Sequence, residues 1–244
     1  MIIITGTGRS GTSFLGKLYV ELGFKVAGAE VWRPDGRPGI EEPIVNQLLA
    51  EIMQDLVIPA GNNILQKTLF SIGKKIIGQK IADKSLRGSL RKRSYVRNQI
   101  LLHDMTKLDV LAKKYQVRIL ELSRNYQVIK APGFCRTLGV WAAAGAPIEH
   151  VVVTMRKTID VIKSQERLNA LRFTDYSLAY NHYALISGYL MAAIADNNLP
   201  ACWIQFPDFL EKPEWLQQQL YFPSKVSDGD FIQAFQKVLA LKPR

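Results

Sequence analysis

The residues whose types and spacing most clearly suggest a chemical function lie at the start of the chain. Residues 5–13 read TGTGRSGTS and follow the apolar run IIIT. A strand, a glycine-rich turn and a helix N-terminus together make an anion site, because the first N–H groups of the helix are free and its dipole is positive there. Glycines allow the tight path, and hydroxyl and guanidinium groups add donors. The residues that we expect to contact the anion are Gly8, Arg9, Ser10, Gly11, Thr12 and Ser13.

This loop is close to the nucleotide-binding pattern G-x-x-x-x-G-K-[ST], but Thr12 stands where that pattern has lysine. In phosphoryl transfer the lysine reaches the β- and γ-phosphates, and Mg²⁺ neutralises the remaining charge. A loop without lysine needs either another cation or a less charged group to transfer. Arg9 offers the cation, and a sulfuryl group carries one negative charge fewer than a phosphoryl group.

The elements that must position this loop follow from periodicity and turn residues. We expect strands at residues 2–5, 24–26, 126–130, 150–155 and 201–206. We expect helices at residues 12–22, 44–56, 135–144, 158–168, 177–195, 213–220 and 228–241. Strands that alternate with helices predict an α/β fold, here a parallel central sheet of about five strands flanked by helices. We interpret the chain as a single domain, residues 1–244, with a helical, basic insertion at about residues 62–118.

The loop TGTGRSGTSFL resembles the 5′-phosphosulfate loop of the sulfotransferases that use 3′-phosphoadenosine 5′-phosphosulfate (PAPS). In that family the loop reads P-[KR]-S-G-T-[ST]-x-[LF], or G-x-G-R-S-G-T-S in many bacterial members. Arg9 falls on the basic position, and residues 10–13 fall on the phosphate-cradling positions. The resemblance implies the P-loop-like sulfotransferase fold, PAPS as donor, adenosine 3′,5′-bisphosphate as product, and no required metal.

A second motif resembles the family's site for the donor's 3′-phosphate. In the family, an arginine at a strand end and a serine eight residues later hold that phosphate. Here the apolar run HVVVTM ends at Arg156, and Ser164 stands eight residues further along the chain. An arginine at the carboxyl end of a central strand also points into the crevice where α/β proteins bind ligands, and its fork suits phosphate.

Candidates for the transfer chemistry come from the same resemblance. VIKAP, at residues 128–132, resembles the strand ending whose lysine reaches the transferred group, so Lys130 is a candidate; the alternative is a strand-end lysine in solvent. Pro132 occupies the position of the family's catalytic histidine, so the base must be another group. Other branches use a glutamate after the first helix, which makes Glu30 and Glu41 the candidates. The expected reaction is in-line transfer to a hydroxyl or amine.

Charge points to an anionic partner. The net charge is +11, and residues 74–97 contain nine lysines and arginines but only one acid, Asp83. This segment suits an acidic glycan acceptor, or a peripheral contact with a membrane that presents a lipid, and a plain solvated basic helix is the other interpretation. Nucleic acid is not favoured, because the segment and the residues just before it contain few aromatic side chains for base stacking, Phe70 and Tyr95 only.

Two other function classes stay open at this stage. The first is a P-loop kinase or other nucleotide-binding protein, although no apolar strand ends in an acid that would complete its Mg²⁺ site. The second is a non-catalytic anion-binding module. No spacing of cysteine and histidine indicates a metal site. Because no apolar run approaches about 18 residues and no charged segment precedes residues 2–5, we expect a cytoplasmic protein.

Overall fold

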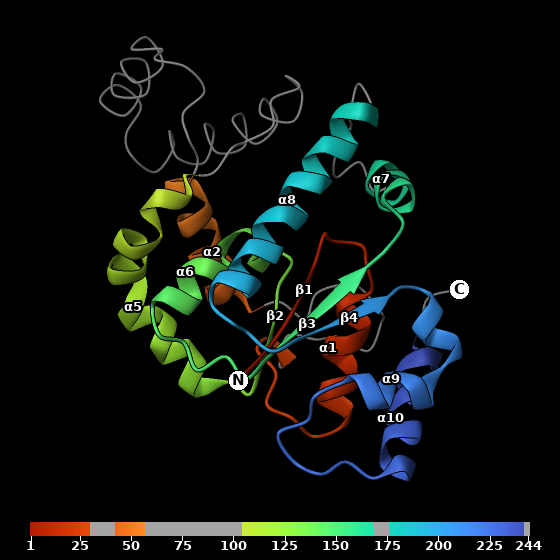
Figure 1. The fold of residues 1–244 in the computed structure, drawn as a ribbon. Helices are drawn as coiled ribbons and strands as arrows, with labels where there is room; N and C mark the ends of the chain where they lie inside the picture. Colours follow the sequence, from red (N-terminus) through yellow and green to blue (C-terminus); the bar gives the residue numbers. More distant parts are fainter. Residues whose placement is uncertain (30–41, 57–103, 168–175, 242–244) are drawn as a thin grey trace, which may run out of the picture.

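The computed structural model describes residues 1–29, 42–56, 104–167 and 176–241, and they form an α/β fold with helices on both faces of a parallel sheet (Figure 1). The sheet has four strands in the order β2-β1-β3-β4, and every neighbouring pair is parallel. The strands are β1 (Ile2–Gly6), β2 (Val128–Lys130), β3 (His150–Met155) and β4 (Ala201–Gln205). The α/β class and the parallel sheet that we expected from the sequence are confirmed.

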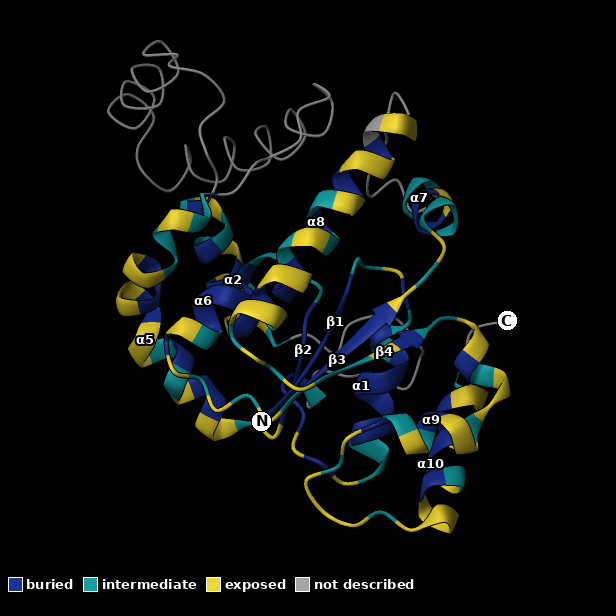
Figure 2. Ribbon diagram, in the orientation of Figure 1, coloured by how far each residue is buried: buried dark blue, intermediate teal, exposed yellow. Residues whose placement is uncertain are grey.

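Alternating side chains of the central strands build two cores (Figure 2). Because successive strand residues point to opposite faces, Ile3 packs into one core while Ile2 and Ile4 pack into the other. The helices on the Ile3 face are α2 (Pro43–Leu56), α5 (Leu108–Asn125), α6 (Phe134–Ala143) and α8 (Tyr176–Asp196). Those on the other face are α1 (Thr12–Glu21), α9 (Pro213–Gln219) and α10 (Asp228–Ala240).

The remaining helix, α7 (Thr158–Arg167), begins just beyond the carboxyl end of β3. It packs on α8 through a small cluster formed by Val161, Ile162, Ala179 and Tyr183. Two short 3-10 helices, η2 (Met105–Lys107) and η3 (Asp208–Glu211), precede α5 and follow β4. Among the helices described here, none is long and apolar enough to cross a membrane.

The strand expected at residues 24–26 is not part of this sheet, so the prediction of a fifth strand was wrong. Only Val26 pairs there, in an isolated parallel bridge with Val128. Gly28 has a φ of 80° two residues later, and this left-handed turn leads the chain away before a second pair can form. Residues 62–103 of the expected insertion lie outside the described residues, and its described remainder is helical, in η2 and the first part of α5.

Since the strands are parallel, their carboxyl ends lie at one edge of the sheet. β1 ends there in the glycine-rich loop, β2 ends in Lys130, and β3 is followed by Arg156. Ligands of open α/β sheets bind at this edge. The fold therefore collects three sequence-predicted groups from segments that lie far apart along the chain.

Candidate anion-binding site

The glycine-rich loop between β1 and α1 follows a left-handed path. Gly8, Arg9 and Gly11 have φ values of 77°, 54° and 94°, and Gly11 caps the N-terminus of α1. For Arg9 this conformation is strained, because its Cβ is crowded there. Such strain concentrates at ligand-binding turns.

Two glycines of this loop are required by close packing. A Cβ at Gly6 would lie 2.5 Å from the hydroxyl oxygens of both Ser10 and Thr154. A Cβ at Gly11 would lie 2.5 Å from Cδ2 of Phe206. Both distances are shorter than real carbon contacts, so the loop can sit against β3 and the end of β4 only with glycine at these positions.

The hydroxyl of Ser10 anchors the loop and is not turned outward as we expected. Ser10 is fully buried, and its Oγ shares a 2.8 Å hydrogen bond with Oγ1 of Thr154 in β3. Thr154 Oγ1 in turn donates to the carbonyl of Thr5 at 3.2 Å. The contribution that remains for Ser10 is its backbone N–H group.

The first turn of α1 supplies further donors. Gly11 makes no side-chain cap, and the first turn holds no acidic residue. The N–H groups of Thr12 and Ser13 have no carbonyl to reach inside the helix, because the first four donors of any α-helix lack intrahelical partners. Thr12 is buried and Ser13 is half-buried, so this end of the helix is a confined place for an anion.

The structure brings Arg9, Arg156 and Ser164 together. Nε of Arg9 donates to Oγ of Ser164 at 3.2 Å, across 155 positions of sequence. Nη1 of Arg156 donates to the carbonyl of Arg9, also at 3.2 Å. The two motifs that we expected to bind two ends of one ligand therefore form a single cluster.

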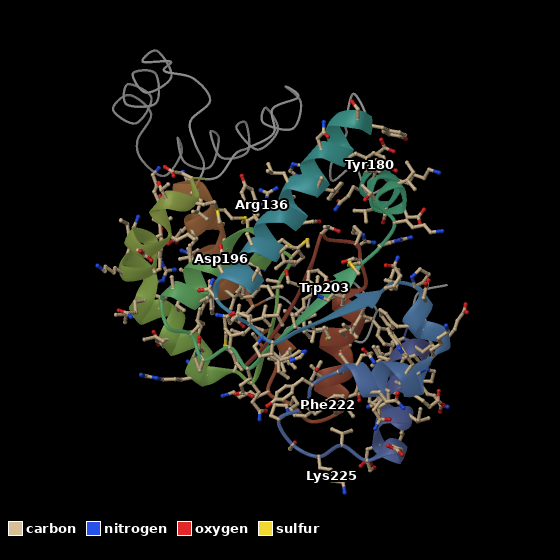
Figure 3. All side chains as sticks on the ribbon, viewed as in Figure 1. Arg136, Tyr180, Asp196, Trp203, Phe222 and Lys225 are labelled. Atoms are coloured by element: carbon tan, nitrogen blue, oxygen red, sulfur yellow. The ribbon has the colours of Figure 1, made fainter. Side chains whose placement is uncertain are left out.

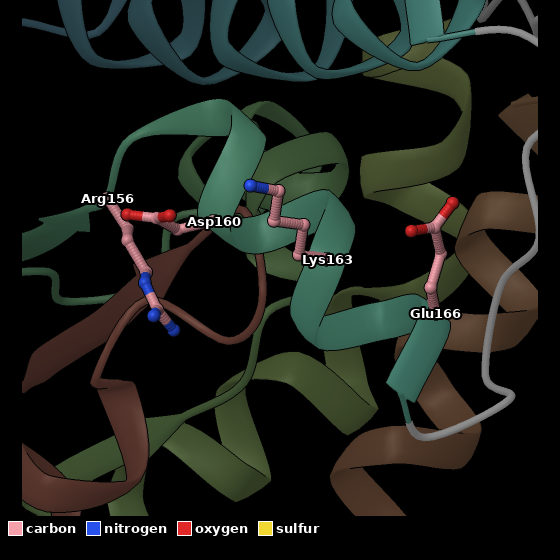
Figure 4. A pocket seen from close by; sticks show the side chains of 4 residues that line it. All are labelled: Arg156, Asp160, Lys163 and Glu166. Carbon is pink, nitrogen blue, oxygen red and sulfur yellow. The ribbon is translucent and has the colours of Figure 1, made fainter.

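The guanidinium of Arg156 packs against an aromatic ring. Its Cζ lies 5.2 Å from the centre of the Phe206 ring, a cation–π arrangement. Its Nε is buried and has no hydrogen-bond partner in the described part of the chain. Arg156 also lines a hollow of about 370 Å³ with Asp160, Lys163 and Glu166 of α7, and Figure 4 shows Arg156 beside Asp160 at one end of this group and Glu166 at the other.

Lys130 lies inside the protein and not in solvent. It is 3% exposed and pairs in register with Ile4 of β1. The interpretation of Lys130 as a solvent-exposed strand-end lysine is therefore wrong. Both candidate bases, Glu30 and Glu41, lie outside the described residues. Glu42 is described, and its Oε1 accepts from the N–H of Ile44 at 3.5 Å where α2 begins.

Neither of the two cysteines is placed as a nucleophile, because the thiolate is the reactive form and burial disfavours it. Burial raises the pKa of the Cys135 thiol, which lies 3.4 Å from Oγ1 of Thr5. Burial also raises the pKa of Cys202 to about 11. Across the described ranges, no group of three or more His, Cys, Asp and Glu side chains could hold a metal ion.

Two features of this edge were not found from the sequence. Phe206 precedes a proline in what reads as an ordinary strand end, and only the fold places its ring under Arg156. Arg136 and His182, which we did not connect, lie 3.2 Å apart between Nη2 and Nε2. No local pattern links residues 46 positions apart on two helices, so no sequence signal could have found this pair.

No family model and no curated protein matches this chain. Among solved structures, it is similar to a sulfotransferase domain from the curacin biosynthetic pathway, with 18% sequence identity and a TM-score of 0.42. The similarity covers 97% of this chain and 77% of that chain.

Proposed function

We propose that this protein is a sulfotransferase that transfers a sulfuryl group from PAPS to a hydroxyl or amine of an acceptor. One observation carries the proposal: Arg9, Arg156 and Ser164 form one hydrogen-bonded cluster at the carboxyl edge of the sheet. These are the residues whose motifs resemble the two donor-binding sites of PAPS-dependent enzymes.

The cluster fits a nucleotide that carries two anionic groups. The loop offers backbone N–H groups and the positive end of α1, while Arg156 has a buried Nε without a partner among the described residues. A ligand phosphate would replace the contact between Arg9 and Ser164, since the side chains of Arg9, Arg156 and Ser164 can all donate hydrogen bonds to an oxyanion. In this proposal Gly8 to Ser13 and Arg9 bind the phosphosulfate, and Arg156 and Ser164 bind the 3′-phosphate.

The transfer needs little beyond positioning and charge. When bound, PAPS supplies a sulfuryl group whose bond to a phosphate oxygen breaks while a bond to the acceptor oxygen forms. Arg9, Lys130 and the first turn of α1 stabilise the negative charge that develops on the transferred and leaving oxygens. A glutamate, Glu30 or Glu41, accepts the acceptor's proton. No metal is required, because cationic side chains carry the charge balance.

The partners follow from this assignment. Adenosine 3′,5′-bisphosphate is the product, and the acceptor is an acidic glycan or a lipid. Residues 74–97, which lie outside the described residues, provide a peripheral membrane contact in this proposal through their nine basic side chains.

The first experiment measures ligand affinity by isothermal titration calorimetry. We expect adenosine 3′,5′-bisphosphate to bind and ATP with Mg²⁺ to bind much more weakly, since the loop lacks the lysine of ATP-using enzymes. Arg156→Gln should weaken binding of the bisphosphate by about 10- to 100-fold, as loss of charge-assisted hydrogen bonds does. Arg124→Gln, on the exposed end of α5, is the control for loss of one charge. Equal affinity in wild type and Arg156→Gln would reject the assignment.

The second experiment addresses catalysis. With PAPS and a panel of hydroxyl acceptors, Arg9→Ala should lower the rate of sulfuryl transfer by about 10²–10³, as removal of one preorganised donor does. Magnesium-dependent ATP turnover in place of sulfuryl transfer would instead identify a P-loop kinase.

A further inference from the structure

We infer that Arg136, held by His182, binds an anionic substituent of the acceptor, a carboxylate or a sulfate or phosphate ester. That the bound anion belongs to a sulfuryl acceptor rests on the proposed function, whereas anion binding by Arg136 is argued from the geometry around its side chain. It selects, among the acceptors of a sulfotransferase, those that already carry a negative charge near the reacting hydroxyl or amine.

The location of Arg136 follows from its chain neighbour. Sγ of Cys135 lies 3.4 Å from Oγ1 of Thr5, and Thr5 is the first residue of the glycine-rich segment 5–13. The N–H of Ala131, after Lys130, donates to the carbonyl of Ile4 at 3.1 Å, which ties this turn to β1. Figure 3 shows Arg136 between α6 and α8, at the end of the sheet where the loop lies. Arg136 is therefore beside the expected site of transfer.

The charge of Arg136 is not balanced by a carboxylate. Its side chain is half-buried, and among the described residues its hydrogen-bond partner is the neutral ring of His182. No ion pair joins it to a described Asp or Glu. Removing a guanidinium from water without a counter-ion is costly. This cost is recovered when an anion binds.

The position of Arg136 on its helix adds to that cost. α6 begins at Phe134, so Arg136 lies in the first turn, where the helix dipole is positive. Cations are favoured at the other end of a helix, so this arrangement destabilises the empty protein and favours a bound oxyanion.

His182 fixes the direction of the guanidinium. Arginine has no hydrogen-bond acceptor, so Nε2 of His182 must accept from Nη2 of Arg136, which places the ring proton on Nδ1. His182 is 7% exposed, and its ring meets that of Tyr183 edge-on with centroids 5.5 Å apart. Tyr183 packs on α7, which also carries Ser164. His182 is thus a positioning residue that links Arg136 to the helix of the donor cluster.

The test uses two matched phenols as probes, 4-hydroxyphenylacetate and its neutral amide. Each is titrated into the whole protein by calorimetry, with and without saturating adenosine 3′,5′-bisphosphate. The side-chain Nε–H resonance of Arg136, assigned by its absence in Arg136→Gln, reports by NMR where the probe binds. We expect the carboxylate to bind about tenfold or more tightly than the amide and to shift this resonance.

The variants separate this site from the donor site. Arg136→Gln should abolish the preference for the carboxylate, whereas Arg156→Gln and Arg124→Gln should leave it unchanged. His182→Gln, whose amide oxygen can still accept from Arg136, should retain most of the preference, and His182→Leu should lose it. Equal binding of the two phenols, or a preference that survives in Arg136→Gln, would overturn the inference. Failure of adenosine 3′,5′-bisphosphate to bind would reject the proposed function instead and leave the Arg136 site standing.

Discussion

Gly11 combines two constraints in one residue. Its φ of 94° is one that residues other than glycine rarely adopt, and a Cβ would lie 2.5 Å from Cδ2 of the Phe206 ring. Gly23 has a similar φ of 83°, but a Cβ at that position would meet nothing within 4 Å. The pair therefore separates backbone strain from steric conflict.

We expect Gly11→Ala to lower the free energy of unfolding by about 2–4 kcal/mol and Gly23→Ala by about 1 kcal/mol. Urea denaturation followed by circular dichroism measures both. The larger loss at Gly11 comes from the displaced Phe206 ring, which also supports Arg156. Equal losses in the two variants would mean that the contact with Phe206 carries no cost.

The site could be predicted from the sequence where the relevant signal is local. Glycine spacing indicates the loop at residues 5–13, and the place of Arg156 after an apolar strand indicates its role. Phe206 and the Arg136–His182 pair could not be predicted, because their contacts depend on how separate helices and strands meet. The same limit applies to Ser10, whose hydroxyl looked like a ligand donor and instead binds Thr154.

At the scale of elements, α2 and α5 are joined by a polar contact at their shared surface. Oδ2 of Asp55 accepts from Nζ of Lys114 at 2.6 Å and from the hydroxyl of Tyr115 at 2.7 Å. Partial burial raises the pKa of the Asp55 carboxyl, but the hydrogen bonds from Lys114 and Tyr115 outweigh it and hold this pKa below its ordinary value. The charged form of Asp55 therefore stabilises the folded protein.

Asp55→Asn should lower the free energy of unfolding at pH 7 by about 1 kcal/mol or less, because the pair is partly exposed. A carboxyl whose pKa is lowered by folding stabilises the folded protein fully at pH values above its unfolded-state pKa of about 4. This stabilisation is lost as the pH falls through the folded-state pKa. The difference between wild type and Asp55→Asn should therefore be constant from about pH 7 to about pH 5 and shrink below about pH 4. Urea titrations at each pH measure it, with the exposed Glu121→Gln of α5 as control. A difference that grows in acid would contradict this assignment.

The elements themselves were largely predictable. The strand at residues 150–155, the helix at 44–56 and the helices from 135–144 onward appear within one or two residues of the expected bounds, whereas α5 runs to Asn125, past the expected end of the insertion at about 118. The strand expected at residues 24–26 did not form because this segment of three residues, of which only Phe24 and Val26 are β-prone, has a left-handed turn on either side, at Gly23 and Gly28. The sequence pattern shows the strand propensity of such a segment, but the number of residues that pair depends on the path of the chain in the folded protein.

At the scale of the whole molecule, a bound nucleotide should stabilise the fold by mass action. With adenosine 3′,5′-bisphosphate at about 100 times its dissociation constant, the gain is about 2.7 kcal/mol. For a chain of this size the melting temperature should rise by about 5–10 °C. Differential scanning fluorimetry measures the shift, with ATP and Mg²⁺ as the comparison ligand. No shift with either nucleotide would argue for a non-catalytic module that binds other anions.

The hydroxyl contact between Ser10 and Thr154 has a consequence for motion. It joins the turn after β1 to β3, the strand that leads into Arg156. The glycine-rich loop and Arg156, which together form the candidate anion site, should therefore move as one rigid unit. NMR order parameters of the backbone N–H groups of residues 8–13 should then be as high as those of the sheet, even with nothing bound. Crystals grown with and without a nucleotide should superpose here, leaving adaptation to the acceptor to other parts of the molecule.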